Sequence, residues 1–362
     1  MRGFLKLILL ILNIAAATGL LVSAYGGHIN PLTTTIPGMM LMLFPGLLLL
    51  SVVMLLVDLF ACRRMMFVQG FAILLSAPAI WNICPLNFFT NEAKPNEREL
   101  KVMTYNVRYL LTDSKDSLHH SLSAIIREDP DIVLLQECRA DDPTHWTRYS
   151  TQVDTLMERY PHRVIEFDSM VMWSKFPIDT LRMEQYPDPS AFFSAADIDI
   201  DGYQLTVLNV HLQSLSLSNN DKELYYNLTV GNLATITDDR IDSTPENLVK
   251  KLSSAMEKRA EQAILLRSQI DSLGRSNILV AGDFNDIADC WAQRTIMGHD
   301  LKSTFSAVGL GPTISYNAFH FYFNIDHMLY GGDIRPLSIR RGRELSSDHY
   351  PVTATYAIPT HD

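Results

Sequence analysis

Polar side chains at the ends of apolar runs are the part of this sequence that could do chemistry. Carboxylates, amides and imidazoles gain little from a place in a hydrophobic core. Several of them converging on one edge of a fold make a site for a hard metal ion and a phosphoryl group, because Mg²⁺ takes oxygen ligands together with substrate phosphate. The residues of this kind are Asn106, Glu137, His211, Asp283, Asn285, Asp326 and His349.

Two apolar segments supply acidic and amide groups. Glu137 ends the run VLLQE, where a carboxylate is costly unless a cation meets it; a salt bridge at the rim is an equal alternative for this residue taken alone. In GDFND the glycine permits a sharp turn, and Asp283 and Asn285, two residues apart, can face one side. One of them can accept a proton or hold a metal ion while the other donates hydrogen bonds to a phosphoryl oxygen.

Two histidines stand near these acidic candidates. His211 lies in LNVHLQS, and His349 follows Asp348 directly, with Asp326 available elsewhere in the fold. A lone histidine is more often structural than catalytic. A carboxylate beside an imidazole, however, fixes its tautomer and raises its pKa, which suits it to acid–base catalysis or to phosphate stabilisation.

The elements that must position these groups are strands and helices without a regular βαβ period. Helical spacing covers 117–128 and 253–273, and an Asp-Gly turn at 201–202 predicts a hairpin. So many strands favour two sheets with flanking helices over one sheet. The predicted strands are 100–106, 131–137, 170–174, 192–200, 204–212, 277–282, 325–330 and 352–356.

The composition divides the chain in two. Residues 1–94 carry five basic and two acidic side chains, which leaves 25 basic and 38 acidic side chains, a formal charge of −13, for residues 95–362. The first part is apolar and the second has an ordinary globular composition. The acidic balance counts weakly against duplex nucleic acid as a partner, since nucleic acid is usually held by basic surface.

Three apolar runs, at 4–25, 38–62 and 65–84, predict transmembrane helices, because about 20 residues cross a bilayer. We expect the first run to be retained, since Ser23-Ala24-Tyr25 is a poor signal-peptide cleavage site and two more runs follow. The domains are then a membrane domain at 1–88, a tether at 89–99 and a catalytic domain at 100–362. Asp58 is expected to snorkel to the interface beside Arg63 and Arg64.

The basic residues predict the orientation. Arg2, Lys6, Arg63 and Arg64 flank the runs on one side, and the loop at 26–37 has no Lys or Arg. The positive-inside rule puts the N-terminus in the cytoplasm, and three crossings place the catalytic domain outside a multi-pass cell-membrane protein. If the third run only dips into the membrane, the catalytic domain is cytoplasmic.

Cysteine usage indicates no zinc or redox motif. The four cysteines form no CxxC pair and no Cys/His zinc spacing. We interpret them as unrelated thiols, with a Cys138–Cys290 disulfide as the alternative outside the cytoplasm.

The motifs TYNVR, LLQE, NVHL, GDFND, IDH and SDHYP, in this order between 104 and 351, resemble the endonuclease/exonuclease/phosphatase superfamily. The resemblance implies a four-layer α/β sandwich, with two mixed β-sheets flanked by helices, and a phosphoester hydrolase that depends on Mg²⁺ or Mn²⁺. The domain order also resembles membrane-anchored bacterial members of the superfamily, which have three N-terminal spans before an external catalytic domain.

Metal and phosphate contacts follow by position in these motifs. The resemblance makes Glu137 the main metal ligand, with Asn106 beside it and Asp348 near the metal. Arg108 matches an arginine that reaches the scissile phosphate in some members. Where the family often has arginine before the Ile-Asp pair, this chain has Asn324, which puts one phosphate or structural contact in doubt.

The resemblance also implies the catalytic set. Asp283 would orient or deprotonate the attacking water, and Asn285 would hold the phosphate. His211 would contact the phosphate from the other side. Asp326 would pair with His349.

Three functions fit this reading. The first is hydrolysis of a lipid phosphate, a prenyl diphosphate or a sphingolipid-like phosphodiester at the outer membrane surface, where tethering concentrates the substrate. The second is an extracytoplasmic nuclease, for which Arg340, Arg341 and Arg343 could contact a phosphate backbone, although a solvated turn is the alternative. The third is an inactive binding or sensor module. The expected partners are the bilayer and a phosphorylated lipid, with nucleic acid under the second function and no protein partner.

The polar stretch 213–250 is the expected specificity element. Its apolar side chains could cap the site or touch lipid, and a disordered surface loop is the alternative. These side chains are Leu215, Leu217, Tyr225, Tyr226 and Leu228.

Overall fold

The computed structural model describes residues 2–111, 118–138, 148–167, 169–187, 191–229, 244–318 and 321–360. These residues form two compact units. The helical unit comprises Met1–Ile83, Leu215–Ala260 and Asp289–Arg294, and the sheet unit comprises Cys84–Ser214, Glu261–Ala288 and Thr295–Asp362.

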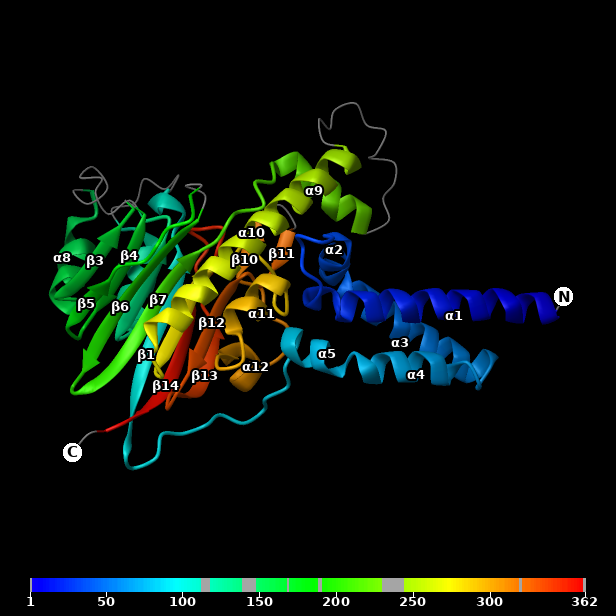
Figure 1. Ribbon diagram of the computed structural model, residues 1–362, viewed down its shortest axis with the longest axis horizontal. Coiled ribbons are helices and arrows are strands. Elements are labelled where there is room, and N and C mark those ends of the chain that lie inside the picture. Colours follow the sequence, from blue (N-terminus) through cyan, green and yellow to red (C-terminus); the bar gives the residue numbers. More distant parts are fainter. Residues whose placement is uncertain are drawn as a thin grey trace. The chain divides into compact units, whose positions relative to one another are not determined.

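The sheet unit is built on two six-stranded mixed sheets (Figure 1). In the first sheet β1 and β2 are parallel and the other neighbours are antiparallel. Its strands, in spatial order, are β13 (Arg335–Arg341), β14 (Val352–Pro359), β1 (Glu97–Asn106), β2 (Ile132–Gln136), β4 (Met170–Ser174) and β3 (His162–Glu166).

The second sheet repeats this arrangement, with β7 and β8 as its parallel pair. Its order is β5 (Ile178–Leu181), β6 (Phe192–Ile200), β7 (Tyr203–His211), β8 (Ile278–Asp283), β12 (Asp326–Gly331) and β9 (Lys302–Ser303). A separate hairpin pairs β10 (Tyr316–Ala318) with β11 (Phe321–Phe323). The predicted fold of two mixed sheets with flanking helices is confirmed.

Alternation along the strands builds two cores. Val102 and Leu134 belong to the core that the two sheets share with residues such as Val207 of β7. Met103 and Leu135, one position on, face the opposite side. That side packs on α6 (His120–Glu128) and α8 (Ser150–Arg159).

Two connections follow from local sequence chemistry. α6 ends at Asp129, whose φ of 45° is left-handed, and Pro130 follows, a sequence that stops a helix. β6 and β7 are joined through Asp201 and Gly202, both with positive φ (52° and 93°). This is the tight hairpin that the Asp-Gly pair predicts.

Among its described residues, the helical unit contains two helices long and apolar enough to cross a membrane, α1 (Arg2–Ala24) and α3 (Phe44–Ala61). α4 (Met66–Leu75) and α5 (Ala77–Ile83) meet at a bend of 55° and count as a third span only if taken together. Pro78 stands next to the break, where its missing N–H and its ring disfavour a continuous helix. The predicted third crossing is therefore a broken pair.

The described part of the helical unit also includes the 3-10 helix η1 (Gly26–His28), α2 (Ile36–Met42), α9 (Asn219–Thr229) and the N-terminal parts of α10 (Pro245–Leu273) and α11 (Trp291–Met297). The stretch 213–250 is thus partly helical, and its residues 230–243 lie outside the described part. The boundary between the units falls within α10. A further short helix, α12 (Thr304–Val308), lies in the sheet unit.

A buried polar cluster joins three helices of the helical unit. Asn13 Nδ2 donates to Asp58 Oδ1 at 3.1 Å, and Gln69 Nε2 donates to Asn13 Oδ1 at 3.0 Å. All three side chains are fully buried. The expectation that Asp58 snorkels was wrong, because a hydrogen-bond partner on α1 is available inside the bundle.

All four cysteines are free thiols. The Cys138–Cys290 disulfide, the alternative raised by the sequence, is not formed.

Candidate active site

Strand ends bring the predicted residues to one edge of the sheet unit. Asn106 ends β1 opposite Gln136, which ends β2 directly before Glu137. His211 ends β7 opposite Asp283, which ends β8. Asp326 begins the antiparallel strand β12 and also pairs with Asp283. Register places these groups together within each sheet, and the hydrogen bonds of Asn106 to Glu137 and Asp283 join the two sheets at this edge.

The chain leaves these strands through strained turns. Glu137 and Asn285 have positive φ of 51° and 52°, and Arg108 has 46°. Non-glycine residues seldom adopt this region, and they concentrate at functional sites. Gly282, before Asp283, has a φ of 151°, and a Cβ there would lie 1.9 Å from Val210 O. Only glycine lets β8 approach β7 this closely.

Asn106 ties the two main acids together. Its Nδ2 donates to Glu137 Oε1 at 3.1 Å and to Asp283 Oδ2 at 3.0 Å. Its Oδ1 accepts from the backbone N–H of Arg108 at 3.0 Å. In this arrangement the amide nitrogen, not the oxygen, faces the carboxylates, so Asn106 braces Glu137.

Asp283 is the centre of the site. It is 1% exposed, and its Oδ1 accepts from the backbone N–H of Asn285 at 2.8 Å. Burial raises the pKa of the Asp283 carboxyl, although His349 and His211 oppose the rise. The amide of Asn285 donates to Leu212 O at 2.9 Å, which holds the residue that follows β7.

Both histidines lie against these acids. His211 Nε2 is 3.7 Å from both Glu137 Oε1 and Asp283 Oδ2. His349 Nε2 is 3.6 Å from Asp283 Oδ2, and its Nδ1 is 2.9 Å from Asp326 Oδ2. Burial alone would lower the pKa of His349, but the carboxylates of Asp326 and Asp283 raise it to about 10. The two carboxylates therefore favour the imidazolium form of His349.

A metal ion fits this donor set. One ligand atom each from Asp283, Asp326 and His349 lies within 4.8 Å of the others. Asp326 Oδ1 is buried without a hydrogen-bond partner in the described part of the chain, which leaves an oxygen for a cation or water. The carboxylates of Asp283 and Asp326, together with that of Glu137, offer the oxygen ligands that Mg²⁺ and Mn²⁺ prefer.

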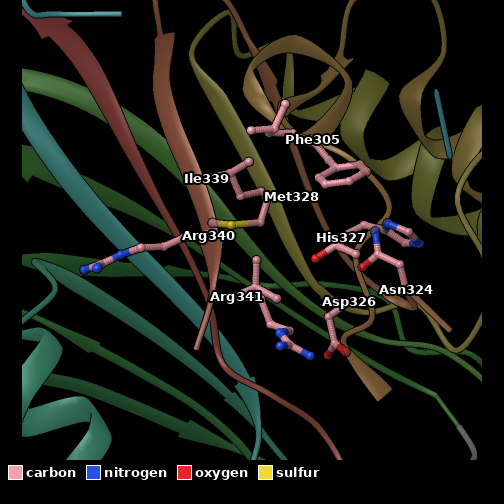
Figure 2. A pocket seen from close by; sticks show the side chains of 11 residues that line it. Phe305, Asn324, Asp326, His327, Met328, Ile339, Arg340 and Arg341 are labelled. Carbon is pink, nitrogen blue, oxygen red and sulfur yellow. The ribbon is translucent and has the colours of Figure 1, made fainter. Parts of the chain in front are cut away.

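A cavity of about 160 Å³ lies behind Asp326. Figure 2 shows the Asp326 carboxylate and the Arg341 guanidinium at the same end of this cavity. Asn324 also lines it. Asn324, at the position where the family often has arginine, thus lines the same cavity as Asp326, and so does Arg341 of β13.

The two remaining predicted residues flank the site. Arg108 Nε is 3.9 Å from Asp348 Oδ2, and the Arg108 side chain is 54% exposed. It is therefore free to meet a substrate anion.

Arg340 and Arg341 are the last residues of β13, so they lie in a strand and not in the solvated turn that the sequence offered as an alternative.

Sequence reasoning missed Tyr316 and Ser347. The Tyr316 ring makes an edge contact with the His349 ring at 4.9 Å, and burial, with Asp348 nearby, raises the pKa of its phenol. Ser347 Oγ donates to Asn106 O at 2.8 Å and accepts from His349 N at 3.1 Å. Its place before Asp348-His349 was a usable signal; nothing in the sequence around Tyr316 was.

An amide pair behind the site was also missed. Gln136 Nε2 donates to Asn209 Oδ1 at 2.6 Å and to Thr104 Oγ1 at 3.0 Å. Asn209 Nδ2 donates to Leu135 O at 3.0 Å and to Val171 O at 3.2 Å. The pair joins the two sheets directly under Glu137 and His211.

This fold and site define a class of phosphoester hydrolase, and comparison with known proteins agrees. Residues 103–349 match the model of the Endonuclease/Exonuclease/phosphatase family. The match covers more than half of the chain, and the chain belongs to this family. Residues 6–83 match a second model, described as a domain of unknown function (DUF8431).

Solved structures resemble the chain in fold. A truncated TDP2 from Caenorhabditis elegans is 15% identical, with coverage of 71% of this chain and 97% of that one and a TM-score of 0.47. An endonuclease/exonuclease/phosphatase family protein from Bacteroides thetaiotaomicron is 15% identical, with coverage of 73% of this chain and 99% of that one and a TM-score of 0.47. The mannosyl-6-phosphatase Bt3783 of that bacterium is 16% identical, with coverage of 71% of this chain and 99% of that one and a TM-score of 0.45. No curated protein matches the chain significantly.

Proposed function

We propose that the protein is a membrane-anchored, divalent-metal-dependent hydrolase of a lipid phosphate or prenyl diphosphate at the outer membrane surface. The observation that carries the hydrolase part is the meeting of Asp283, Asp326 and His349, with Glu137 beside them, at one sheet edge. These residues come from four strands or their ends, and no packing requirement explains their convergence.

Glu137 is the proposed main ligand of Mg²⁺ or Mn²⁺, with Asp348 near the ion and Asn106 holding Glu137 in place. The bound ion would supply charge neutralisation at a non-bridging oxygen and at the leaving oxygen. Arg108 is exposed enough to meet the same phosphate.

The remaining groups handle the water and the phosphate. Asp283 orients the attacking water and accepts its proton at a carboxylate oxygen. Asp326 holds His349 through Nδ1 at 2.9 Å, so that Nε2–H points to the reacting centre. His211 Nε2 and the free N–H of Asn285 donate to phosphate oxygens. Such donors stabilise developing charge only if they are fixed beforehand.

The substrate class rests on the helical unit. Two helices, or three with the bent pair, are long and apolar enough to cross a membrane. With the bent pair taken as a third crossing, the basic residues on one side of these runs favour an external sheet unit. A tethered enzyme meets a bilayer substrate at a high effective concentration, which favours a phosphorylated lipid over a dilute soluble ester.

A substrate panel tests this proposal. The purified full-length chain in nanodiscs is incubated with a lipid monophosphate, a prenyl diphosphate, a sphingolipid phosphodiester and plasmid DNA. We expect Mg²⁺-dependent phosphate release from a lipid substrate that EDTA and Glu137→Ala abolish. Release from no member of the panel would remove the hydrolase proposal and leave the inactive binding module.

A labelling experiment tests the outer-surface location. Gln204 is exposed on β7, so Gln204→Cys should react with a membrane-impermeant thiol reagent in intact cells. Reaction only after permeabilisation would place the sheet unit in the cytoplasm.

A nuclease is the second candidate, because arginines line an open depression of about 530 Å³. Arg127, Arg340, Arg341 and Arg343 contribute to it. Two of them are already paired, Arg127 with Glu344 and Arg340 with Glu128, which halves the charge available to a phosphate backbone. Mg²⁺-dependent digestion of plasmid DNA that is lost in Glu137→Ala would favour this candidate.

A further inference from the structure

The segment that follows α5 is fastened to the sheet unit. Asn87 Nδ2 donates to Gly309 O at 2.9 Å and to Ser306 O at 3.2 Å, and Gly311 N donates to Pro85 O at 2.7 Å. Asn91 Nδ2 donates to Pro336 O at 3.2 Å. The segment 85–91, which includes the first residues of the predicted tether at 89–99, is therefore held by the sheet unit at several points.

Large apolar side chains project outward from this fastened segment. Phe88 is 70% exposed and Phe89 is 89% exposed, and they stand between the two asparagines that hold the backbone. Leu86 is 50% exposed and forms a β-bridge with Leu310, which is 58% exposed. We call these four residues the apolar patch. Their exposure is costly in water, since each ring or side chain could bury substantial apolar area.

Both segments that build the apolar patch lack charge. No Asp, Glu, Lys or Arg occurs from Met65 to Asn91, nor from Ser303 to Ile325. The uncharged run of the last membrane helix thus continues past its end at Ile83 as far as the second asparagine. A charged side chain would oppose entry into the headgroup and acyl boundary of a bilayer, and here there is none.

We propose that the apolar patch is an interfacial anchor that seats the sheet unit on the bilayer surface. Phe89 stands six residues after Ile83, so its backbone lies within about 20 Å of the helix end. Aromatic side chains are favoured at that depth. The proposal rests on the membrane anchoring described above, and it adds that the sheet unit itself touches lipid.

Site-directed labelling in nanodiscs tests the proposal. Cys62→Ser and Cys84→Ser remove the partly exposed thiols, while Cys138 and Cys290 are buried. The environment-sensitive fluorophore NBD is then placed at Phe89→Cys, and spin-labelled phosphatidylcholine serves as quencher. We expect quenching and a blue-shifted emission at position 89. Emission without quenching, whether water-exposed or shielded by protein, would overturn the anchor.

Two control positions separate this outcome from failure of the membrane anchoring. Val53 lies in the middle of α3 and is 47% exposed, and Ile165 lies on β3 of the sheet unit and is 50% exposed. The label should be quenched at Val53→Cys and not at Ile165→Cys. Quenching at 53 without quenching at 89 rejects the apolar patch alone, whereas no quenching at 53 rejects the anchoring as well.

A second variant tests the patch as a whole. With NBD at Leu310→Cys, the pair Phe88→Ser and Phe89→Ser should reduce lipid quenching several-fold, while Ile165→Ser should leave it unchanged. Both phenylalanines are exposed, so their replacement spares the core. Hydrolysis of a bilayer substrate should fall several-fold in the double variant, and that of a water-soluble phosphoester should not. Unchanged quenching at 310 would contradict the proposal.

Discussion

Replacing Asn209 tests whether the amide pair between the sheets positions the site. Asn209 accepts one hydrogen bond from Gln136 Nε2 at 2.6 Å and donates two, to Leu135 O and Val171 O at 3.0 and 3.2 Å. Leucine has the same branching at Cγ and can form none of them. Asn209→Leu therefore removes the link between the sheets with little change in volume.

The expected cost follows from those three bonds. Each contributes about 1 kcal/mol net, so the loss is about 3 kcal/mol. Gln136 keeps its bond to Thr104 Oγ1, which limits the additional cost of an unpaired amide. Since 1.4 kcal/mol is a factor of ten, local opening of β2 and β7 should increase about 10²-fold.

Hydrogen exchange measured by mass spectrometry reports that opening strand by strand. Peptides covering β2 and β7 should exchange faster in Asn209→Leu by about that factor. The half-saturating Mg²⁺ concentration for hydrolysis should rise, because Glu137 directly follows Gln136 and His211 stands two residues beyond Asn209.

Gln204→Leu is the matched control, because Gln204 lies on the same strand and is exposed. Its effect should stay within about 0.5 kcal/mol. If Asn209→Leu matched this control in both exchange and Mg²⁺ dependence, the amide pair would have no positioning role and the reasoning would fail.

Three further predictions concern single side chains. Asp326→Asn should lower kcat by about 10²-fold or more, because His349 loses the carboxylate that orients it. If Asp326 were mainly a metal ligand, a Mg²⁺ titration would instead show a higher half-saturating Mg²⁺ concentration in this variant. Burial lowers the pKa of His327, whose Nε2–H donates to Asp286 O at 2.8 Å. The unfolded state then binds the extra proton, so stability is full above about pH 6.5 and is lost as pH falls through the folded pKa. His327→Gln should flatten this loss in unfolding curves recorded between about pH 7 and pH 5. Asn13→Leu removes the shared partner of two buried polar side chains and should cost about 1–2 kcal/mol in detergent unfolding; Ile14→Leu, which is lipid-facing by its 52% exposure, should cost nothing measurable.

Local patterns were sufficient where neighbours in sequence decide the structure. The Asp201-Gly202 turn and most central strands were predicted within a few residues, because turn chemistry and apolar runs are local. The edge strands β3 and β5 were missed, since all their residues are half-buried or exposed and carry a weak apolar signal. The edge strand β13 was also missed. One reason is Pro336, which argues against a strand in the sequence but is tolerated at the edge of a sheet.

The candidate site was predictable in membership but not in geometry. The polar strand ends were visible because a carboxylate or imidazole has no reason to end an apolar run. The assigned roles remain predictions. Asn106 was predicted to lie beside Glu137 and to help orient the metal ion. Its amide nitrogen bridges Glu137 and Asp283, and the backbone N–H of Arg108 occupies its oxygen, a contact that no local pattern predicts.

By itself the sequence determined the family, the apolar helices and the residues able to do the chemistry, because residue type and local order are sufficient for these. Only the tertiary structure decided which residues contact one another. Ser347 forms a hydrogen bond with Asn106, 241 positions away, and Gln136 forms one with Asn209, 73 positions away. Asp58 accepts a hydrogen bond from Asn13 inside the helical unit and does not face water. Such contacts depend on how strands and helices are brought together, and no local pattern records a partner so far along the chain.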